Sequence, residues 1–285
     1  VAVIVRGQLP LPPYLLALAM SANLGSVATL VGNPQNMIIG SLSKLPFFDF
    51  SASLLPVAVA GLAIEYAILS LGFRKLLRAT VIQPSQSAPR ALNRPLMLIC
   101  ITTLALVFAG FVAGLDLAWT ALAGAAVVMV LARHDTHQVL KLVDWHLLVF
   151  FAALFIVVAG LNGTGLPDQV YSHLRGLFGA TVTSQAWNLA WFSAAGSNIF
   201  SNVPFVLVAG KWLPNFANPD LMWKVLALAT TFAGNLTILG SVANIIVVES
   251  ARGHCEVSFW DYAKFGIPIT ILTTTTGLAM LLVFG

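Results

Sequence analysis

Three long stretches of this chain contain no Asp, Glu, Lys or Arg. They run from Gly7 to Ser43, from Gly176 to Gly210 and from Val225 to Val248. Each is long enough to cross the ~30 Å hydrocarbon core of a bilayer as a helix. Only 8% of the residues are charged, whereas soluble domains carry about a quarter. The sequence therefore predicts an all-α polytopic membrane protein whose partner is the lipid bilayer.

The basic residues indicate the topology of the predicted spans. Arg74–Arg94 carries five Arg or Lys residues and no acid, which predicts a cytoplasmic linker because cytoplasmic loops are enriched in Lys and Arg. We expect three parts: 1–73, a linker 74–95, and 96–285. Because this charge is a topology signal, we expect no nucleic-acid partner, and the two cysteines indicate neither a disulfide framework nor a thiolate metal site.

The sequence contains a repeat. Residues 29–39 and 237–247 share Thr, Gly, Asn and Ile at matching places, 208 positions apart. Downstream, an aromatic-aromatic-Asp-aromatic motif at 47–50 and again at 259–262 is followed six residues later by proline. Counting spans from the cytoplasmic linker places the first motif outside and the second inside. The two copies therefore predict an inverted-topology repeat, which is typical of secondary transporters with interrupted helices.

Gly, Pro and amide residues inside an apolar run predict a broken helix. Lipid offers the backbone no hydrogen bonds, so such a break survives only against protein or a watery cavity. Its hydroxyls, amides and freed carbonyls are then uncharged ligands for an anion or for Na⁺. The candidate binding residues are Thr29, Gly32, Asn33, Asn36, Thr237, Gly240 and Asn244. The alternative is that these small polar residues only pack helices closely.

A second polar cluster, 196–205, contains two Ser-Asn pairs and a proline within an uncharged run. It predicts a re-entrant hairpin with Asn198, Ser201 and Asn202 as further candidate ligands. A Pro-kinked span is the alternative. By symmetry the first repeat needs a matching hairpin before Val1, so we expect this chain to begin just after the tip of that hairpin.

With these motifs, and with 144–158 and 257–268, nearly the whole chain resembles the arsenite efflux and sodium/proton antiporter group of the ion transporter superfamily. That superfamily also contains citrate and divalent-anion/sodium symporters, and within it the chain is most similar to putative anion transporters. The resemblance implies a scaffold that often dimerises and a transport domain that moves like an elevator. We expect a prokaryotic cytoplasmic (inner) membrane protein, a homodimer by analogy, and no cofactor beyond coupling Na⁺ or H⁺.

Glu65 is the only charged residue in its predicted span, 53–73. An intramembrane carboxylate is a functional candidate by default, here as a proton or cation site. No further ligand at metal-like spacing accompanies His134, His137 and His146, so no metal site is predicted.

The uncharged repeat motif favours a secondary active carrier of a small inorganic or carboxylate anion, working by alternating access. A sodium/proton antiporter is the alternative, with Glu65 as its titratable carboxylate. A passive channel and an intramembrane enzyme are less favoured, because inverted broken helices indicate alternating access and no metalloprotease or nucleophile motif occurs. No catalytic residue is predicted.

Overall fold

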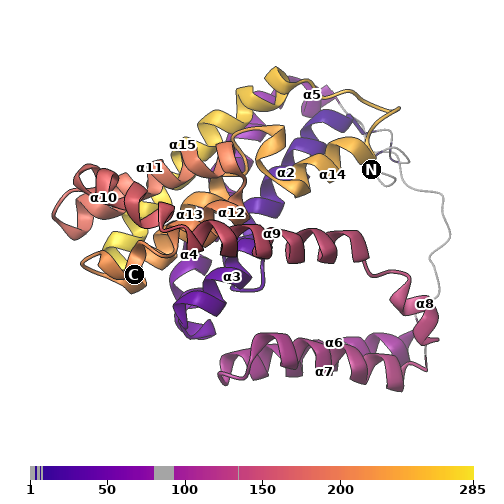
Figure 1. The fold of residues 1–285 in the computed structure, drawn as a ribbon. Coiled ribbons are helices and arrows are strands. Elements are labelled where there is room, and N and C mark those ends of the chain that lie inside the picture. The colour runs from indigo at the N-terminus through magenta and orange to yellow at the C-terminus, as the bar shows by residue number, and fades with distance from the viewer. Residues whose placement is uncertain (1–3, 5–6, 8, 80–92, 134) are drawn as a thin grey trace. The chain divides into compact units, whose positions relative to one another are not determined.

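The computed structural model describes residues 4, 7, 9–79, 93–133 and 135–285, and the regular structure of that part is helical (Figure 1). Four of these helices are long and apolar enough to cross a membrane: α4 (Phe47–Gly72), α6 (Arg94–Val112), α9 (Trp145–Gly163) and α15 (Phe259–Phe284). A fifth apolar helix, α7 (Leu117–Leu131), is shorter. The predicted all-α polytopic membrane protein is confirmed.

The remaining helices are shorter or more polar. They are α2 (Leu11–Ser26), α3 (Pro34–Ser43), α5 (Arg74–Ala79), α8 (Thr136–Leu140), α10 (Leu166–Phe178), α11 (Val182–Phe200), α12 (Asn202–Ala209), α13 (Pro219–Ala233) and α14 (Val242–Ser250), with 3-10 turns η1 (Leu213–Asn215) and η2 (Ile238–Gly240).

Local sequence sets where several of these helices begin. The Ser258 hydroxyl accepts a hydrogen bond from the backbone N–H of Asp261, and the Asp261 carboxylate accepts one from the backbone N–H of Ser258. This pair is a capping box that starts α15. The apolar run alone predicts a start at Gly266, so the helix is longer than expected. Its first turn contains one acid, Asp261, which is favourable at a helix N-terminus.

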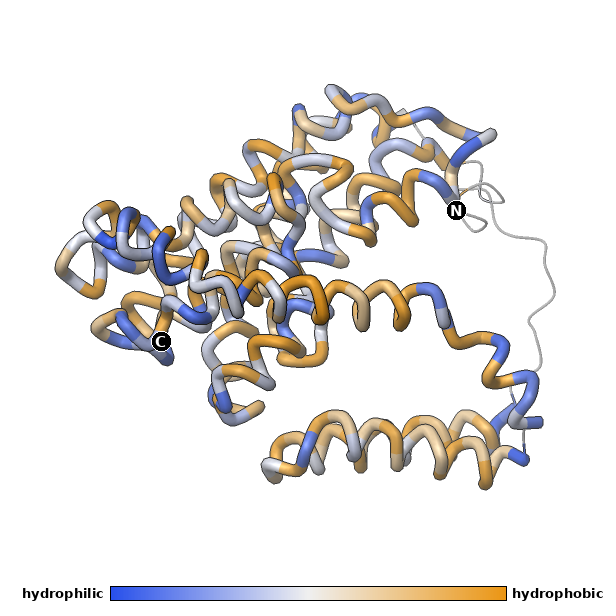
Figure 2. Tube along the Cα trace, in the orientation of Figure 1, coloured by the Kyte–Doolittle hydropathy of each residue, from blue (hydrophilic) through white to orange (hydrophobic). Residues whose placement is uncertain are grey.

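The chain divides into two compact units. The first contains residues 1–45, 49–85 and 161–285, and the second contains 46–48 and 86–160. In the second unit, α6 and α7 pack against each other, and apolar residues run along most of both helices (Figure 2). The predicted boundary at 74–95 stays a prediction, and residues 80–92 of that linker lie outside the described part.

The first unit is built around α13, which is buried from Leu221 to Ala233. Helices α11, α15, α3 and α2 all pack on it. Most residues of this enclosed helix are apolar, and the polar Lys224, Thr230 and Thr231 on it are also buried. Polar groups in such a position need hydrogen-bond partners within the protein.

Helices α11 and α12 form the predicted hairpin. They meet at Ser201, whose φ of 69° breaks the helix, and α12 packs back on α11. The Phe205 ring lies against Gly196, where a Cβ would overlap it, and 6.1 Å from the Phe192 ring centre. How deep this hairpin lies in a bilayer stays a prediction.

Candidate functional site

The first interruption separates α2 from α3. Between Ser26 and Pro34 the chain is not helical, so carbonyl groups at the end of α2 lose their helical partners. The Asn36 side chain donates to the carbonyl oxygens of Ser26 (3.2 Å) and Thr29 (3.0 Å). Asn33 caps α3 by accepting the Asn36 amide at 2.8 Å. One buried asparagine therefore holds the break closed.

The second interruption repeats this arrangement. Asn244 donates to the carbonyl oxygens of Gly234 (2.6 Å) and Thr237 (3.0 Å), which lie 10 and 7 residues before it. The carbonyl groups that Asn36 binds stand at the same two spacings. Ser241 caps α14, as Asn33 caps α3. The sequence repeat is thus also a repeat of hydrogen bonds.

Each interruption also binds the helix that precedes the other one, and the two contacts are reciprocal. The Asn33 amide donates to the Thr231 hydroxyl at 3.2 Å, and the Ser241 hydroxyl donates to the Asn23 carbonyl oxygen at 2.8 Å. In the 208-residue repeat, Asn33 corresponds to Ser241 and Asn23 corresponds to Thr231. The two hydrogen bonds therefore join equivalent positions of the two repeats. Reciprocal contacts of this kind are those of a two-fold axis, as two inverted repeats require.

Asn23 is the centre of this network. Its amide donates to the side-chain oxygens of Asn235 (2.8 Å) and Asn244 (3.0 Å), and all three residues are buried. Asn235 donates in turn to the Met20 carbonyl oxygen on α2. The sequence analysis missed Asn23, Thr231, Asn235 and Ser241. Applying the 208-residue shift to every polar residue would have found the matched pairs Asn23–Thr231 and Asn33–Ser241.

The matched glycines allow close backbone approach. A Cβ on Gly32 would overlap the Ser26 carbonyl oxygen, and one on Gly240 would lie 2.9 Å from the Gly234 carbonyl oxygen. Ser26 and Gly234 are themselves matched by the repeat. Neither glycine has a positive φ, so the absent side chain is what each break requires.

The hairpin tip meets the second break. The Asn198 amide donates to the Ala233 carbonyl oxygen at 2.9 Å, and the Thr237 hydroxyl lies 3.4 Å from the Asn198 side-chain oxygen. The Asn202 amide donates to the Gly240 carbonyl oxygen at 3.3 Å. Ser201 is exposed at the tip, and its side chain makes no capping hydrogen bond.

Two acceptors in this cluster are unused within the described part of the chain. The side-chain oxygens of Asn36 and Asn202 are both inaccessible to solvent and have no hydrogen-bond partner there. These oxygens belong to the first break and to the hairpin tip, whose helices α3 and α12 pack together. Uncharged oxygens of this type bind a cation or a hydrogen-bond donor on a ligand.

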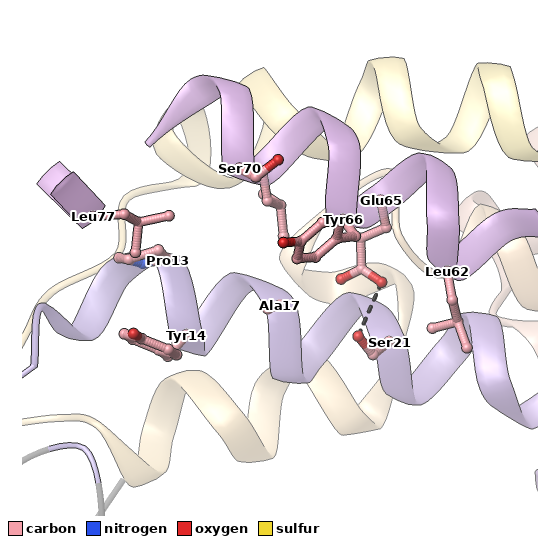
Figure 3. Close-up of a pocket in the computed structure, with 10 residues that line it drawn as sticks. Pro13, Tyr14, Ala17, Ser21, Leu62, Glu65, Tyr66, Ser70 and Leu77 are labelled. Carbon is pink, nitrogen blue, oxygen red and sulfur yellow. Dashed lines mark hydrogen bonds between the residues drawn. The ribbon is translucent and has the colours of Figure 1, made fainter. Parts of the chain in front are cut away.

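Glu65 faces a pocket lined by residues of α2 and α4 (Figure 3). Its Oε2 accepts a hydrogen bond from the Ser21 hydroxyl of α2 at 2.9 Å, and the residue is only 2% exposed. In the described part of the chain, no hydrogen bond joins it to the candidate residues of the breaks or of the hairpin. In the described ranges, no three His, Cys, Asp or Glu residues come together as metal ligands would.

Two helices broken at matched positions, joined by reciprocal hydrogen bonds and met by a helical hairpin, are the features of polytopic secondary transporters. The comparison of sequences is consistent with that class. The chain belongs to the citrate transporter family, whose model matches residues 1–233. This family is one of transporters in the ion transporter superfamily and not of enzymes.

Individual relatives are similar over most of the chain. The rice silicon efflux transporter LSI3 is 32% identical over 96% of the chain and 71% of its own length. A 46 kDa membrane protein of Mycobacterium leprae is 31% identical over 92% of the chain and 65% of its own length. An arsB transporter of Dictyostelium discoideum is 36% identical over 64% of the chain and 33% of its own length. The chain thus spans about two thirds of the mycobacterial relative.

Proposed function

We propose that this chain is part of a secondary active transporter that carries a small anion, of the oxyanion or carboxylate class, by elevator-like alternating access. The observation that carries the proposal is the reciprocal hydrogen bonding of the two broken segments, Asn33 to Thr231 and Ser241 to Asn23. In secondary transporters built from inverted repeats, two interrupted helices related by a pseudo-two-fold axis form the site around which alternating access takes place.

The chemistry of the cluster supports an anionic substrate. Its candidate ligands are amides, hydroxyls and backbone groups, and none of them is a carboxylate that would repel an anion. Helices α3 and α14 both begin at the breaks, and a helix N-terminus favours negative charge. The family is named for citrate and one relative for silicon efflux, which fits a substrate rich in oxygen.

The unused oxygens of Asn36 and Asn202 support a cation beside the anion. Backbone carbonyl oxygens at unwound helices hold Na⁺ in other transporters, and a carboxamide oxygen is an acceptor of the same kind. We therefore propose Na⁺ or H⁺ as the coupling ion and no other cofactor. A homodimer and a prokaryotic cytoplasmic membrane remain parts of the same proposal, and mycobacterial relatives support that membrane.

A sodium/proton antiporter is the second candidate. The buried carboxylate of Glu65 favours it, because such an antiporter needs a titratable group within the membrane. The position of Glu65 outside the amide cluster favours the anion carrier.

Reconstitution of the full-length protein into vesicles tests the proposal. Uptake of radiolabelled citrate, sulfate and arsenite is measured with a Na⁺ gradient, a pH gradient or neither. We expect uphill uptake of one of these, reduced at least tenfold by Asn202→Ala, since this change removes both the contact with Gly240 and an unused acceptor. The matched control is Asn215→Ala, an exposed asparagine outside the cluster.

Two results contradict the proposal. Uptake that never exceeds equilibrium indicates a channel. Na⁺-dependent proton movement without any anion uptake indicates the antiporter.

A further inference from the structure

Glu65 is a buried acid that has no counter-ion among the described residues. It sits within α4, and in the described part of the chain its carboxylate has no ion-pair partner. Oε2 accepts the Ser21 hydroxyl, whereas Oε1 is inaccessible and has no hydrogen-bond partner among the described residues. An unpaired carboxylate inside a membrane protein is costly. A proton or another cation must therefore neutralise Glu65 for part of any working cycle.

A pocket of about 350 Å³ lies beside this carboxyl group (Figure 3). Helices α2 and α4 and Leu77 of α5 line it, and its lining is mostly apolar. The titratable neighbours are Tyr14 on α2, Tyr66 on α4 and Tyr262 on α15. Tyr262 is fully buried, and its hydroxyl also has no partner in the described ranges. Among the residues that the structure describes, no Lys, Arg or His lines the pocket.

This lining favours a proton over a metal cation. Na⁺ in membrane transporters is held by several oxygens, including carbonyls at broken helices. Around Glu65 the oxygens are one carboxyl group and a few hydroxyls, and the helices α2 and α4 are unbroken there. A proton needs only one oxygen, and Oε1 is free to take it.

Helix α2 connects this carboxyl group to the amide cluster. Ser21, which binds Glu65, stands two residues before Asn23, which binds Asn235 and Asn244. A change of charge at Glu65 therefore acts on the same helix that ends in the first break.

We propose that Glu65 carries the coupling proton of the transport cycle, taken up on Oε1 from one side of the membrane and released to the other. This inference rests on the proposed transport function and narrows its coupling ion to a proton. No bond other than the carboxyl O–H forms or breaks.

The first test needs no transport. Dicyclohexylcarbodiimide is apolar and adds to protonated carboxyl groups, whose proton moves to a nitrogen of the reagent. We expect mass spectrometry of the full-length protein to find the adduct on Glu65, with at least fivefold less labelling at pH 9 than at pH 6. The exposed Glu249, which pairs with Arg252, is the internal control and should stay unlabelled. Absence of a Glu65 adduct at low pH overturns the proposal.

The second test uses Glu65→Gln, which keeps the shape and removes the exchangeable proton. We expect pH-driven uptake to fall at least tenfold, while exchange of internal for external anion continues within twofold of wild type. The matched control Glu249→Gln should change neither. Wild-type, pH-driven accumulation by Glu65→Gln overturns the proton assignment and leaves the transport function standing. If the wild type moves no anion under any gradient, the transport function fails instead, and this is visible without any variant.

Discussion

At the scale of single residues, asparagine explains how a site without charge survives inside a membrane protein. One carboxamide offers two donors and an acceptor. The side-chain amides of Asn36 and Asn244 each donate hydrogen bonds to two backbone carbonyl groups that lost their helical partners at the break. The Asn36 oxygen has no hydrogen-bond partner in the described part of the chain, which is why we propose it as a ligand. A charged side chain in the same place would carry the larger cost of burial in the bilayer.

Gly32 gives the sharpest prediction at this scale. We expect Gly32→Ala to destabilise the protein by about 1–3 kcal/mol, because the new Cβ would overlap the Ser26 carbonyl oxygen. That oxygen is also a partner of Asn36, so the first break must shift. Thermal unfolding in detergent, followed by size-exclusion chromatography, measures the effect.

Gly25→Ala is the matched control, since a Cβ there meets nothing within 4 Å. It lies in the last turn of α2, just before the break, and should be neutral or slightly stabilising, because alanine favours helix more than glycine does. Equal melting temperatures for the two variants would refute the steric account of the first break.

At the scale of elements, the sequence predicts the breaks better than the network between them. The glycine and asparagine signals shared by 29–39 and 237–247 are local, so the two interruptions follow from them. The Asn23–Asn235 contact joins residues 212 positions apart. Asn23 also lies inside a regular helix, so no local pattern distinguishes it from a packing residue. The first turns of α4 and α15 each carry an aspartate among aromatic residues, and they were missed because the predicted spans were placed by uninterrupted apolar runs.

The hairpin of α11 and α12 depends on one unusual backbone conformation. Ser201 has φ 69° and ψ 150°, a region almost reserved for glycine that costs other residues about 1–3 kcal/mol. We expect Ser201→Gly to raise stability by about 1 kcal/mol and to lower transport at least tenfold, because it relieves the strain and removes a candidate ligand.

Ser201→Ala separates the two effects. It removes the hydroxyl and keeps the strained backbone, so transport should fall without a gain in stability. Both quantities come from thermal unfolding and vesicle uptake on the same preparations. Normal transport by both variants would remove Ser201 from the site.

At the scale of the whole molecule, the repeat has a consequence for topology. A pseudo-two-fold axis in the membrane plane exchanges the two faces of the bilayer. The loop after α3 and the loop after α14 are matched by the repeat, because each precedes an aromatic-aromatic-Asp-aromatic motif that starts α4 or α15. These two loops must therefore open to opposite sides. The basic segment Arg74–Arg94, which follows α4, is predicted to lie in the cytoplasm. This prediction places the loop after α3 outside and the loop after α14 in the cytoplasm.

Cysteine labelling tests this topology directly. One protein keeps native Cys255 as its single cysteine, with Cys100→Ser; the other carries Ser43→Cys, with both native cysteines replaced by serine. We expect a membrane-impermeant maleimide to label Cys255 at least tenfold more in inside-out vesicles, and the Ser43→Cys protein at least tenfold more in right-side-out vesicles. Both changes at Ser43 and Cys100 are nearly isosteric, and normal transport confirms that each protein is folded. Labelling of both positions from one side contradicts inversion, because a parallel repeat relates its copies by an axis along the membrane normal and leaves matched loops on the same face.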